Sequence, residues 1–245
     1  MPKQQPEQQA PPVQRLRVRY AKRGRLRFTS HRDFSRAFER AVFRARVPMA
    51  YSSGFNPHPR ISYAGAAPTG SASEAEYLEL ALAEVVVPAD VHAMLDEALP
   101  PGLDVLDVVE SPGGSLSDLL EGSRWRIDLL VDHDTALDAV TRFLAADEAL
   151  VERMTKKGMR EFDARGAVVS LAVLPSEAAG DLQPARTSLD VVLRHGTPAV
   201  RPDDVLRGLT AVAGLEPGES PLMTRLEQGP LLASGAIGDP LDVRA

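Results

Sequence analysis

The first quarter of the chain contains the stretch Ser30-His-Arg-Asp-Phe-Ser-Arg-Ala-Phe-Glu-Arg-Ala-Val-Phe-Arg44. Ser30 is followed three residues later by an acid, a pattern that often begins a helix because such side chains satisfy free backbone N–H groups. Apolar side chains then recur at helical spacing, at Phe34, Ala37, Phe38, Ala41, Val42 and Ala45. This stripe predicts an amphipathic helix with one face in a core.

The other face of this predicted helix has an arginine at every fourth position, at Arg32, Arg36, Arg40 and Arg44. Like charges at this spacing repel one another by a few tenths of a kcal/mol per pair, and only Glu39 offers local relief. A solvated helix face is the ordinary explanation of such a charge run. With so few acids nearby, the arginines favour an anionic partner instead.

Short elements flank the helix on both sides. Leu16, Val18 and Tyr20 alternate with arginines, which predicts a strand with one buried face, and Leu26–Phe28 is expected to be extended. Further strands are predicted at Arg60–Ala64, Tyr77–Ala83 and Leu103–Val109, and a second helix is predicted at Asp90–Leu99. The resulting order, β-α-β-β-α-β, is the ferredoxin-like arrangement.

A similar order recurs in the second half of the chain. Its predicted elements are a strand at Trp125–Val131, a helix at Thr135–Ala146, extended pieces near Arg160–Asp163 and Ala167–Leu174, a strand at Ser188–Leu193, a helix at Asp203–Ala213 and a strand at Leu222–Glu227. We therefore expect an α+β protein of two tandem ferredoxin-like (βαββαβ) domains. The expected boundaries are a disordered tail at 1–13, a basic domain at 14–110, a linker at 111–123, a second domain at 124–228 and a flexible tail at 229–245.

Charge is distributed unevenly along the 245 residues, whose formal net charge is −6. Between Val13 and Tyr63 there are 13 basic and two acidic residues, a net charge of +11. From Ala64 to Ala245 there are 14 basic and 31 acidic residues, a net charge of −17. The basic segment also holds eight of the twelve aromatic residues. Basic and aromatic residues interleaved in this way are typical of proteins that bind RNA or single strands.

The segment from Tyr51 to Arg60 is predicted to be a loop in which two prolines fix the backbone on either side of His58. In an RNA-binding protein the arginines would hold phosphates, Tyr51 and Phe55 would stack on bases, and Asn56 and His58 would hydrogen-bond base edges or the 2′-OH. The full set of expected RNA-binding residues is Arg32, Arg36, Arg40, Arg44, Tyr51, Phe55, Asn56, His58, Arg60, Lys156 and Lys157. The two lysines form a second basic cluster, which is either a surface hairpin or an extension of the same binding track.

Several function classes are excluded or disfavoured by missing residues. The chain has no cysteine, so it has no disulfides, thiolate zinc sites or cysteine-ligated iron–sulfur clusters. No two histidines have metal-ligand spacing, and neither a Gly-x-Gly-x-x-Gly motif nor a P-loop is present, so we expect neither metal nor cofactor. Glu74 and Glu76 are expected on the solvent side of a strand rather than in a metal cluster. Without a membrane-length apolar run or a signal sequence, we expect a soluble, cytoplasmic protein.

Three strings in the sequence resemble the radical-SAM-linked family of unknown function: Arg17–Asp33, Tyr51–Ser62 and Ser73–Glu79. The Lys156-Lys157-Gly158 segment with Glu161 and Asp163 fits as well. The resemblance implies a domain that often follows a radical-SAM, cobalamin-type module, or is encoded alone near ribonuclease E/G and ribosomal-protein genes. This chain resembles the stand-alone form. Because it lacks cysteine, any radical-SAM cluster would have to belong to a partner.

These observations favour an RNA-binding adaptor or recognition subunit in rRNA or tRNA modification or processing. Its partner would be an enzyme of radical-SAM type or of the ribonuclease E/G pathway. Two alternatives stay open. One is a metal-independent endoribonuclease in which His31 and His58 act as general base and acid. The other is a protein-docking module whose basic helix binds an acidic partner. Because the chain has no cluster ligands and no nucleotide-binding motif, the sequence favours a role without catalysis.

Overall fold

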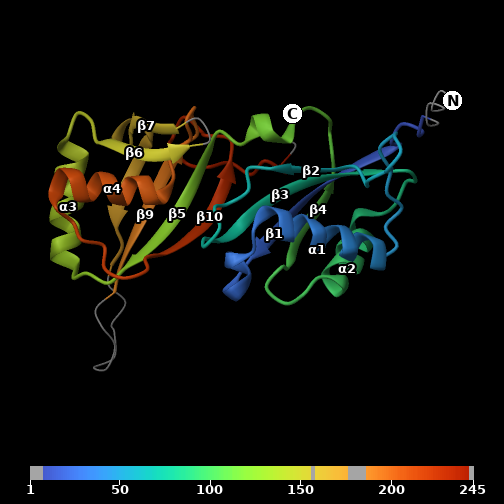
Figure 1. Cartoon of the computed structure of the whole chain (residues 1–245), viewed down its shortest axis with the longest axis horizontal. Coiled ribbons are helices and arrows are strands. Elements are labelled where there is room, and N and C mark those ends of the chain that lie inside the picture. The colour runs from blue at the N-terminus through green and yellow to red at the C-terminus, as the bar shows by residue number, and fades with distance from the viewer. Residues whose placement is uncertain (1–7, 156–157, 176–185, 243–245) are drawn as a thin grey trace. The chain divides into compact units, whose positions relative to one another are not determined.

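The computed structural model of the protein describes residues 8–155, 158–175 and 186–242. Within these residues the chain is a mixture of four α-helices and antiparallel β-strands, which confirms the expected α+β class (Figure 1). It divides into two compact units, which we call unit 1 (Met1–Leu119 with Leu241–Ala245) and unit 2 (Leu120–Pro240). The division falls inside the stretch for which a linker is expected.

Unit 1 has the element order β-α-β-β-α-β. Its elements are β1 (Gln14–Lys22), α1 (His31–Arg44), β2 (Ile61–Ala64), β3 (Ala72–Leu82), α2 (Pro88–Ala98) and β4 (Val105–Glu110). The strands lie in the order β4-β1-β3-β2, and every neighbouring pair is antiparallel. Two short 3-10 helices complete the unit, η1 (Gly24–Phe28) and η2 (Leu116–Leu119).

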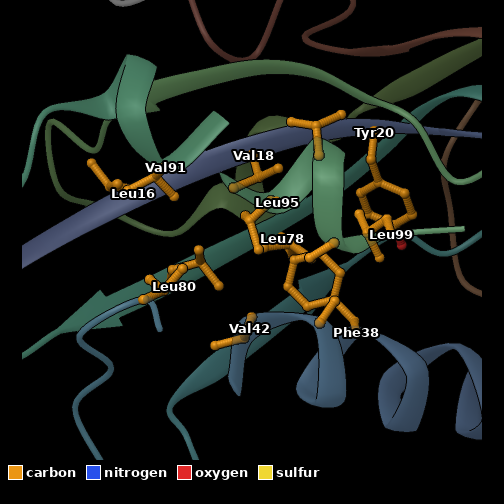
Figure 2. Packing of buried hydrophobic residues seen from close by; sticks show 14 of the residues in the cluster. Leu16, Val18, Tyr20, Phe38, Val42, Leu78, Leu80, Val91, Leu95 and Leu99 are labelled. Carbon is orange, nitrogen blue, oxygen red and sulfur yellow. The ribbon is translucent and has the colours of Figure 1, made fainter. Parts of the chain in front are cut away.

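The core of unit 1 lies between its sheet and its two helices. Figure 2 shows Leu16, Val18 and Tyr20 of β1 and Leu78 and Leu80 of β3 packed against side chains of α1 and α2. These helix side chains include Phe38, Val42, Val91 and Leu95, all buried. The predicted apolar stripe of α1 is therefore the face that the core covers, and its opposite face points away from the sheet.

The first turn of α1 forms as the sequence predicts. The Ser30 hydroxyl oxygen accepts a hydrogen bond from the backbone N–H of Asp33 at 3.2 Å, and it donates one to the Asp33 carboxylate at 2.7 Å. By contrast, Leu26–Phe28 is not extended but belongs to η1. Gly24 adopts a positive φ of 55°, which turns the chain, and the N–H of Leu26 then bonds to the carbonyl of Arg23.

β3 begins five residues earlier than the alternating pattern predicts, because its first half buries polar side chains. Glu76 is buried, and its carboxylate accepts the backbone N–H of Ala67 at 3.2 Å. Glu79 is also buried and lies directly opposite Arg17 of β1. The expectation that Glu76 lies on the solvent side of its strand is therefore wrong. A buried polar residue looks solvent-facing in a sequence because its hydrogen-bond partner is not evident from the sequence alone.

Unit 2 contains the elements β5 (Gly122–Leu129), α3 (His133–Ala145), β6 (Leu150–Thr155), β7 (Gly158–Asp163), η3 (Arg165–Ala167), β8 (Val168–Val173), β9 (Thr187–Arg194), α4 (Pro202–Ala213) and β10 (Leu222–Gly229). Four strands pair antiparallel in the order β10-β5-β9-β8. The helices α3 and α4 pack side by side, and Gly208 allows this because a Cβ there would lie 2.8 Å from the ring of Phe143. β6 is an element that the sequence pattern does not predict.

The hairpin of β6 and β7 forms a separate two-stranded sheet. Arg153 of β6 forms an ion pair with the buried carboxylate of Asp204 in α4, and its guanidinium lies 4.9 Å from the ring centroid of Phe162. Arg207 of α4 donates to the carbonyl of Glu152 at 3.2 Å. These contacts attach the hairpin to the helical side of unit 2.

Beyond β10, the chain makes a tight turn rather than running straight on. The N–H of Gly238 bonds to the carbonyl of Pro230 at 2.8 Å, and Leu231 bridges to Ile237. The tails predicted at 1–13 and 229–245 lie partly outside the described residues, at 1–7 and 243–245.

None of the helices described is both long and apolar enough to cross a membrane.

Candidate functional site

Two groups of arginines in the basic segment differ in their partners, one on β1 and the turn after it and one on α1. Those of β1 and the following turn are paired with acids. Arg15 lies 2.8 Å and Arg17 3.5 Å from the carboxylate oxygens of Glu79, and Arg19 lies 3.7 Å from Asp107. Arg23 is held by Glu74 and Asp104, and its hydrogen bond to Glu74 raises its pKa further above its already high ordinary value. The charge of this group is therefore neutralised within unit 1.

The second group lies on α1 and has no acidic partner. Arg32, Arg36 and Arg40 are all exposed, and none forms an ion pair with any residue that the structure describes. Their guanidinium groups follow one side of the helix, because residues four apart lie on the same face. We call Arg32, Arg36 and Arg40 the cationic face of α1.

Arg44, the last residue of α1, has a structural role that the sequence does not show. Its guanidinium donates a hydrogen bond to the backbone carbonyl of Ala98, the last residue of α2. The final carbonyls of a helix lack partners within that helix and carry a partial negative charge. Arg44 therefore caps α2 and ties the ends of the two helices together, whereas Arg36 and Arg40 remain available to a ligand.

An open groove of about 930 Å³ lies beside the cationic face, within unit 1. One wall is α1, with Arg36, Arg40 and Phe43, and another is formed by Tyr51 and Pro59 of the following loop. The end of α2 completes it with Glu97, Ala98, Leu99 and Pro100. The groove thus combines guanidinium groups with aromatic and aliphatic surface. α1 and α2 can be followed in Figure 1, where they lie next to each other under the sheet of unit 1.

The loop from Tyr51 to Arg60 is closed at its base by hydrogen bonds. Tyr51 bridges to Pro59, and the Ser52 N–H bonds to the His58 carbonyl at 2.9 Å. Arg60 donates from Nε to the Tyr51 carbonyl at 3.0 Å. In the rest of the loop, Phe55, Asn56 and His58 are all exposed, Phe55 at 70%.

His31 and His58 lie in different parts of unit 1. His31 lies at the start of α1, where its ring meets the ring of Tyr63 edge-on at a centroid distance of 5.1 Å. Tyr63 is half-buried in β2, and burial raises its pKa to about 12. His58 lies in the exposed loop between α1 and β2. A role of the two imidazoles in RNA cleavage stays a prediction.

Lys156 and Lys157 lie outside the described residues. The flanking strands β6 and β7 pair in register from Leu150↔Asp163 to Thr155↔Gly158, as in the surface hairpin considered from the sequence.

Phe43 lines the groove but is not among the RNA-binding residues expected from the sequence. Its side chain is 80% exposed, more than any other large apolar residue of unit 1 that the structure describes. A signal for it was present, because Phe43 is not part of the buried stripe. At 3.6 residues per turn it lies about 180° around the helix from Phe34, among the arginines. Phe43 therefore lies outside the core and adds an exposed ring to the groove.

Within the described part of the chain, no three histidine or acidic side chains gather as a metal site would require. Glu74 and Glu79 bond to arginines and Glu76 to a backbone N–H, so these carboxylates already have partners.

The sequence was also compared with known proteins. Residues 15–202 match the model of a family described as uncharacterized proteins conserved in bacteria, DUF2344. The chain belongs to this family. The DUF2344 match includes α1, the loop from Tyr51 to Arg60 and α2, and hence the whole groove, and it ends at the first residue of α4. Among curated proteins, none matches this sequence.

Proposed function

We propose that this DUF2344 protein binds single-stranded RNA along the cationic face of α1 and the groove beside it. The observation that carries the proposal is the contrast between the arginines of β1 and those of α1. Arginines whose charge serves the fold are paired with acids, whereas Arg32, Arg36 and Arg40 are exposed side by side without such partners. Guanidinium groups placed in this way suit phosphate oxygens, to which they can form two parallel hydrogen bonds.

The aromatic residues of the groove favour single strands over duplexes. Phe43 and Tyr51 present exposed rings next to Arg36 and Arg40, and Phe55 is exposed at the loop tip. In a duplex the faces of the bases are already stacked on one another, so only unpaired bases can stack on these rings. We assign phosphate binding to the cationic face, stacking to Phe43, Tyr51 and Phe55, and hydrogen bonding to Asn56 and His58.

The biological role that follows is that of an adaptor. We propose that the protein presents rRNA or tRNA to a modifying or processing enzyme, of radical-SAM type or of the ribonuclease E/G pathway, in the cytoplasm. The resemblance to the radical-SAM-linked family and the absence of cysteine support a partner that carries the cluster.

The test is binding of a short fluorescent RNA to the purified full chain by fluorescence anisotropy, across a series of salt concentrations. We expect log affinity to fall linearly with log salt, with a slope of about −0.7 per phosphate neutralised. In the double variant Arg36→Gln/Arg40→Gln the affinity should fall at least tenfold, and the slope should become shallower by about 1.4.

The matched control is Arg142→Gln/Arg194→Gln, which removes two positive charges from exposed positions in unit 2. If RNA binds electrostatically to the whole molecule, the two double variants should lose equal affinity, and the proposal is wrong. Binding that is insensitive to salt would also contradict it.

We further propose that both units are variants of the ferredoxin-like fold. Support comes from the strand order β4-β1-β3-β2 in unit 1 and from the equivalent order β10-β5-β9-β8 in unit 2. Unit 2 would then differ by the insertion of the β6–β7 hairpin after α3. An experimental structure with a different strand order in either unit would refute this assignment.

A further inference from the structure

The groove contains carboxylates as well as cations. Glu97 lines it from α2 and Glu39 from α1, although Arg36, Arg40 and Arg44 line the same groove. Neither carboxylate forms an ion pair with a residue in the described part of the chain. A groove that bound only phosphates would gain nothing from these acids, because a carboxylate repels a phosphate at short range.

The position of Glu97 conflicts with the electrostatics of its own helix. It is the second-to-last residue of α2, where unsatisfied carbonyls make the helix end partially negative and acidic side chains are disfavoured. Local rules of this kind are broken most often at functional positions. Arg44 relieves the same helix end by bonding to the Ala98 carbonyl, but it does not pair with Glu97.

Unpaired nucleobases provide the group that such a carboxylate can bind. An ionised carboxylate only accepts hydrogen bonds, so it recognises donors such as the exocyclic amino groups of cytosine, adenine and guanine. Uracil offers a carbonyl at the position where cytosine offers its amino group, and a carboxylate would be repelled there. Phe43 and Tyr51, which line the same groove, supply rings on which the same base can stack.

We propose that Glu97 recognises a base with an exocyclic amino group, of which cytosine is the simplest case, while Arg36 and Arg40 hold the adjoining phosphates. This inference rests on the RNA binding proposed above and specifies which single strands the groove accepts. Cytosine and uracil are the informative pair because both are pyrimidines of the same size, so that stacking area is matched and they differ only at C4 and N3, where cytosine has an amino group and an acceptor nitrogen and uracil has a carbonyl and an N–H.

The experiment compares the affinities of the full chain for oligocytidine and oligouridine RNAs of equal length at one salt concentration. We expect oligocytidine to bind about tenfold more tightly, as one good contact to a base edge provides. In Glu97→Gln the preference should fall below roughly twofold, because an amide can donate to uracil as well as accept from cytosine. Glu84→Gln, which removes an exposed acid from another part of unit 1, should keep the full preference.

Each outcome has a distinct meaning. Equal binding of both oligonucleotides by the unmodified chain overturns base recognition but leaves the RNA-binding proposal intact. A preference that persists in Glu97→Gln shows that another residue recognises the base, so the assignment to Glu97 is wrong. If neither RNA binds at low salt, the proposed function itself fails, and this inference fails with it.

Discussion

Arg17 and Arg36 have the same side chain but opposite surroundings, and the difference explains what each contributes. Arg17 is 1% exposed, donates to the Gly113 carbonyl at 2.7 Å and lies beside Glu79. A charge removed from water in this way is tolerable only while its partners are present. Arg36 is exposed in the groove without an acidic partner among the residues described, so its charge is available for binding rather than for folding.

Replacement of Glu79 should therefore destabilise unit 1 strongly. Glu79→Gln keeps the shape of the side chain but leaves Arg17 buried without a counter-charge, which typically costs about 3–5 kcal/mol. The free energy of unfolding measured by urea titration checks this. As the control, Arg23→Gln removes an arginine whose ion pairs are half-exposed, and it should cost at most about 1 kcal/mol. If the two variants lost equal free energy of unfolding, the buried guanidinium of Arg17 would not depend on the charge of Glu79.

His195 should make the stability of unit 2 depend on pH. Its Nδ1 lies 2.7 Å from the Leu120 carbonyl oxygen and its Nε2 2.9 Å from the Ser123 hydroxyl, and burial lowers its pKa below the ordinary value of 6.5. Because the unfolded chain takes up this proton more readily than the folded chain, the stability contributed by the neutral imidazole is present above about pH 6.5. It is lost as the pH falls below that value, towards the lowered pKa of the folded state.

The measurement is the free energy of unfolding as a function of pH, followed by the fluorescence of Trp125. In His195→Gln the decline below pH 6.5 should be shallower than in the unmodified chain. His133→Gln, at the exposed start of α3, is the control and should retain the original pH dependence. Unchanged pH dependence in His195→Gln would show that other groups cause the acid sensitivity.

At the scale of elements, α1 is the structure on which the proposed site depends. The Ser30 cap begins the helix, and its buried stripe fixes which face the arginines occupy. Removal of the cap in Ser30→Ala should cost about 1 kcal/mol of unfolding free energy, whereas Ser30→Gly should cost only a few tenths. Urea titration of both variants separates the two, and equal costs would mean that the hydroxyl is not what stabilises the first turn.

The sequence predicted elements whose signals are local and missed those that depend on distant partners. Ser30, Asp33 and the apolar stripe lie within one helix, so α1 could be predicted almost to the residue. The first half of β3 was missed because its buried polar residues, Ser73 and Glu76, interrupt the apolar alternation, and the backbone N–H of Ala67 that bonds to Glu76 is not evident from a single sequence. The same limit applies to the site: the arginine run was visible, but not which arginines were already paired.

Glu97 and Tyr51 illustrate the same limit within the groove. Tyr51 could be selected because it lies in a proline-rich loop close to the arginines in sequence. Glu97 comes from α2, and only the packing of α2 against α1 brings it to the groove. Phe43 falls between these cases, since its position opposite the buried stripe could have been read from the helical period alone.

At the scale of the whole molecule, each unit has its own buried core. Phe38 lies in the core of unit 1 and Phe143 in that of unit 2, both fully buried. The chain has one tryptophan, Trp125 of β5, so its fluorescence reports on unit 2 alone. Probes of secondary structure, such as circular dichroism, report on both units. The two signals together can therefore distinguish the unfolding of one unit from that of the other.

Phe38→Ala should lower the stability of unit 1 by about 3–5 kcal/mol, as expected when a buried aromatic ring is removed. In a denaturant titration of this variant, part of the circular dichroism signal should be lost before the fluorescence of Trp125 changes. Phe143→Ala should instead move the fluorescence transition to lower denaturant. If both signals move together in Phe38→Ala, the two units unfold as one cooperative body.

The cationic face of α1 consists entirely of arginine, and this determines which chemical modifications can alter it. The four lysines of the chain are Lys3, Lys22, Lys156 and Lys157, and none belongs to α1; among the residues that the structure describes, no lysine lines the groove. Lysine acetylation, which removes positive charge from many proteins, therefore has no target there. Guanidinium groups also stay protonated at any pH a cell experiences. The charge of this face is thus permanent, and its occupancy depends on competing anions rather than on lysine modification or proton uptake.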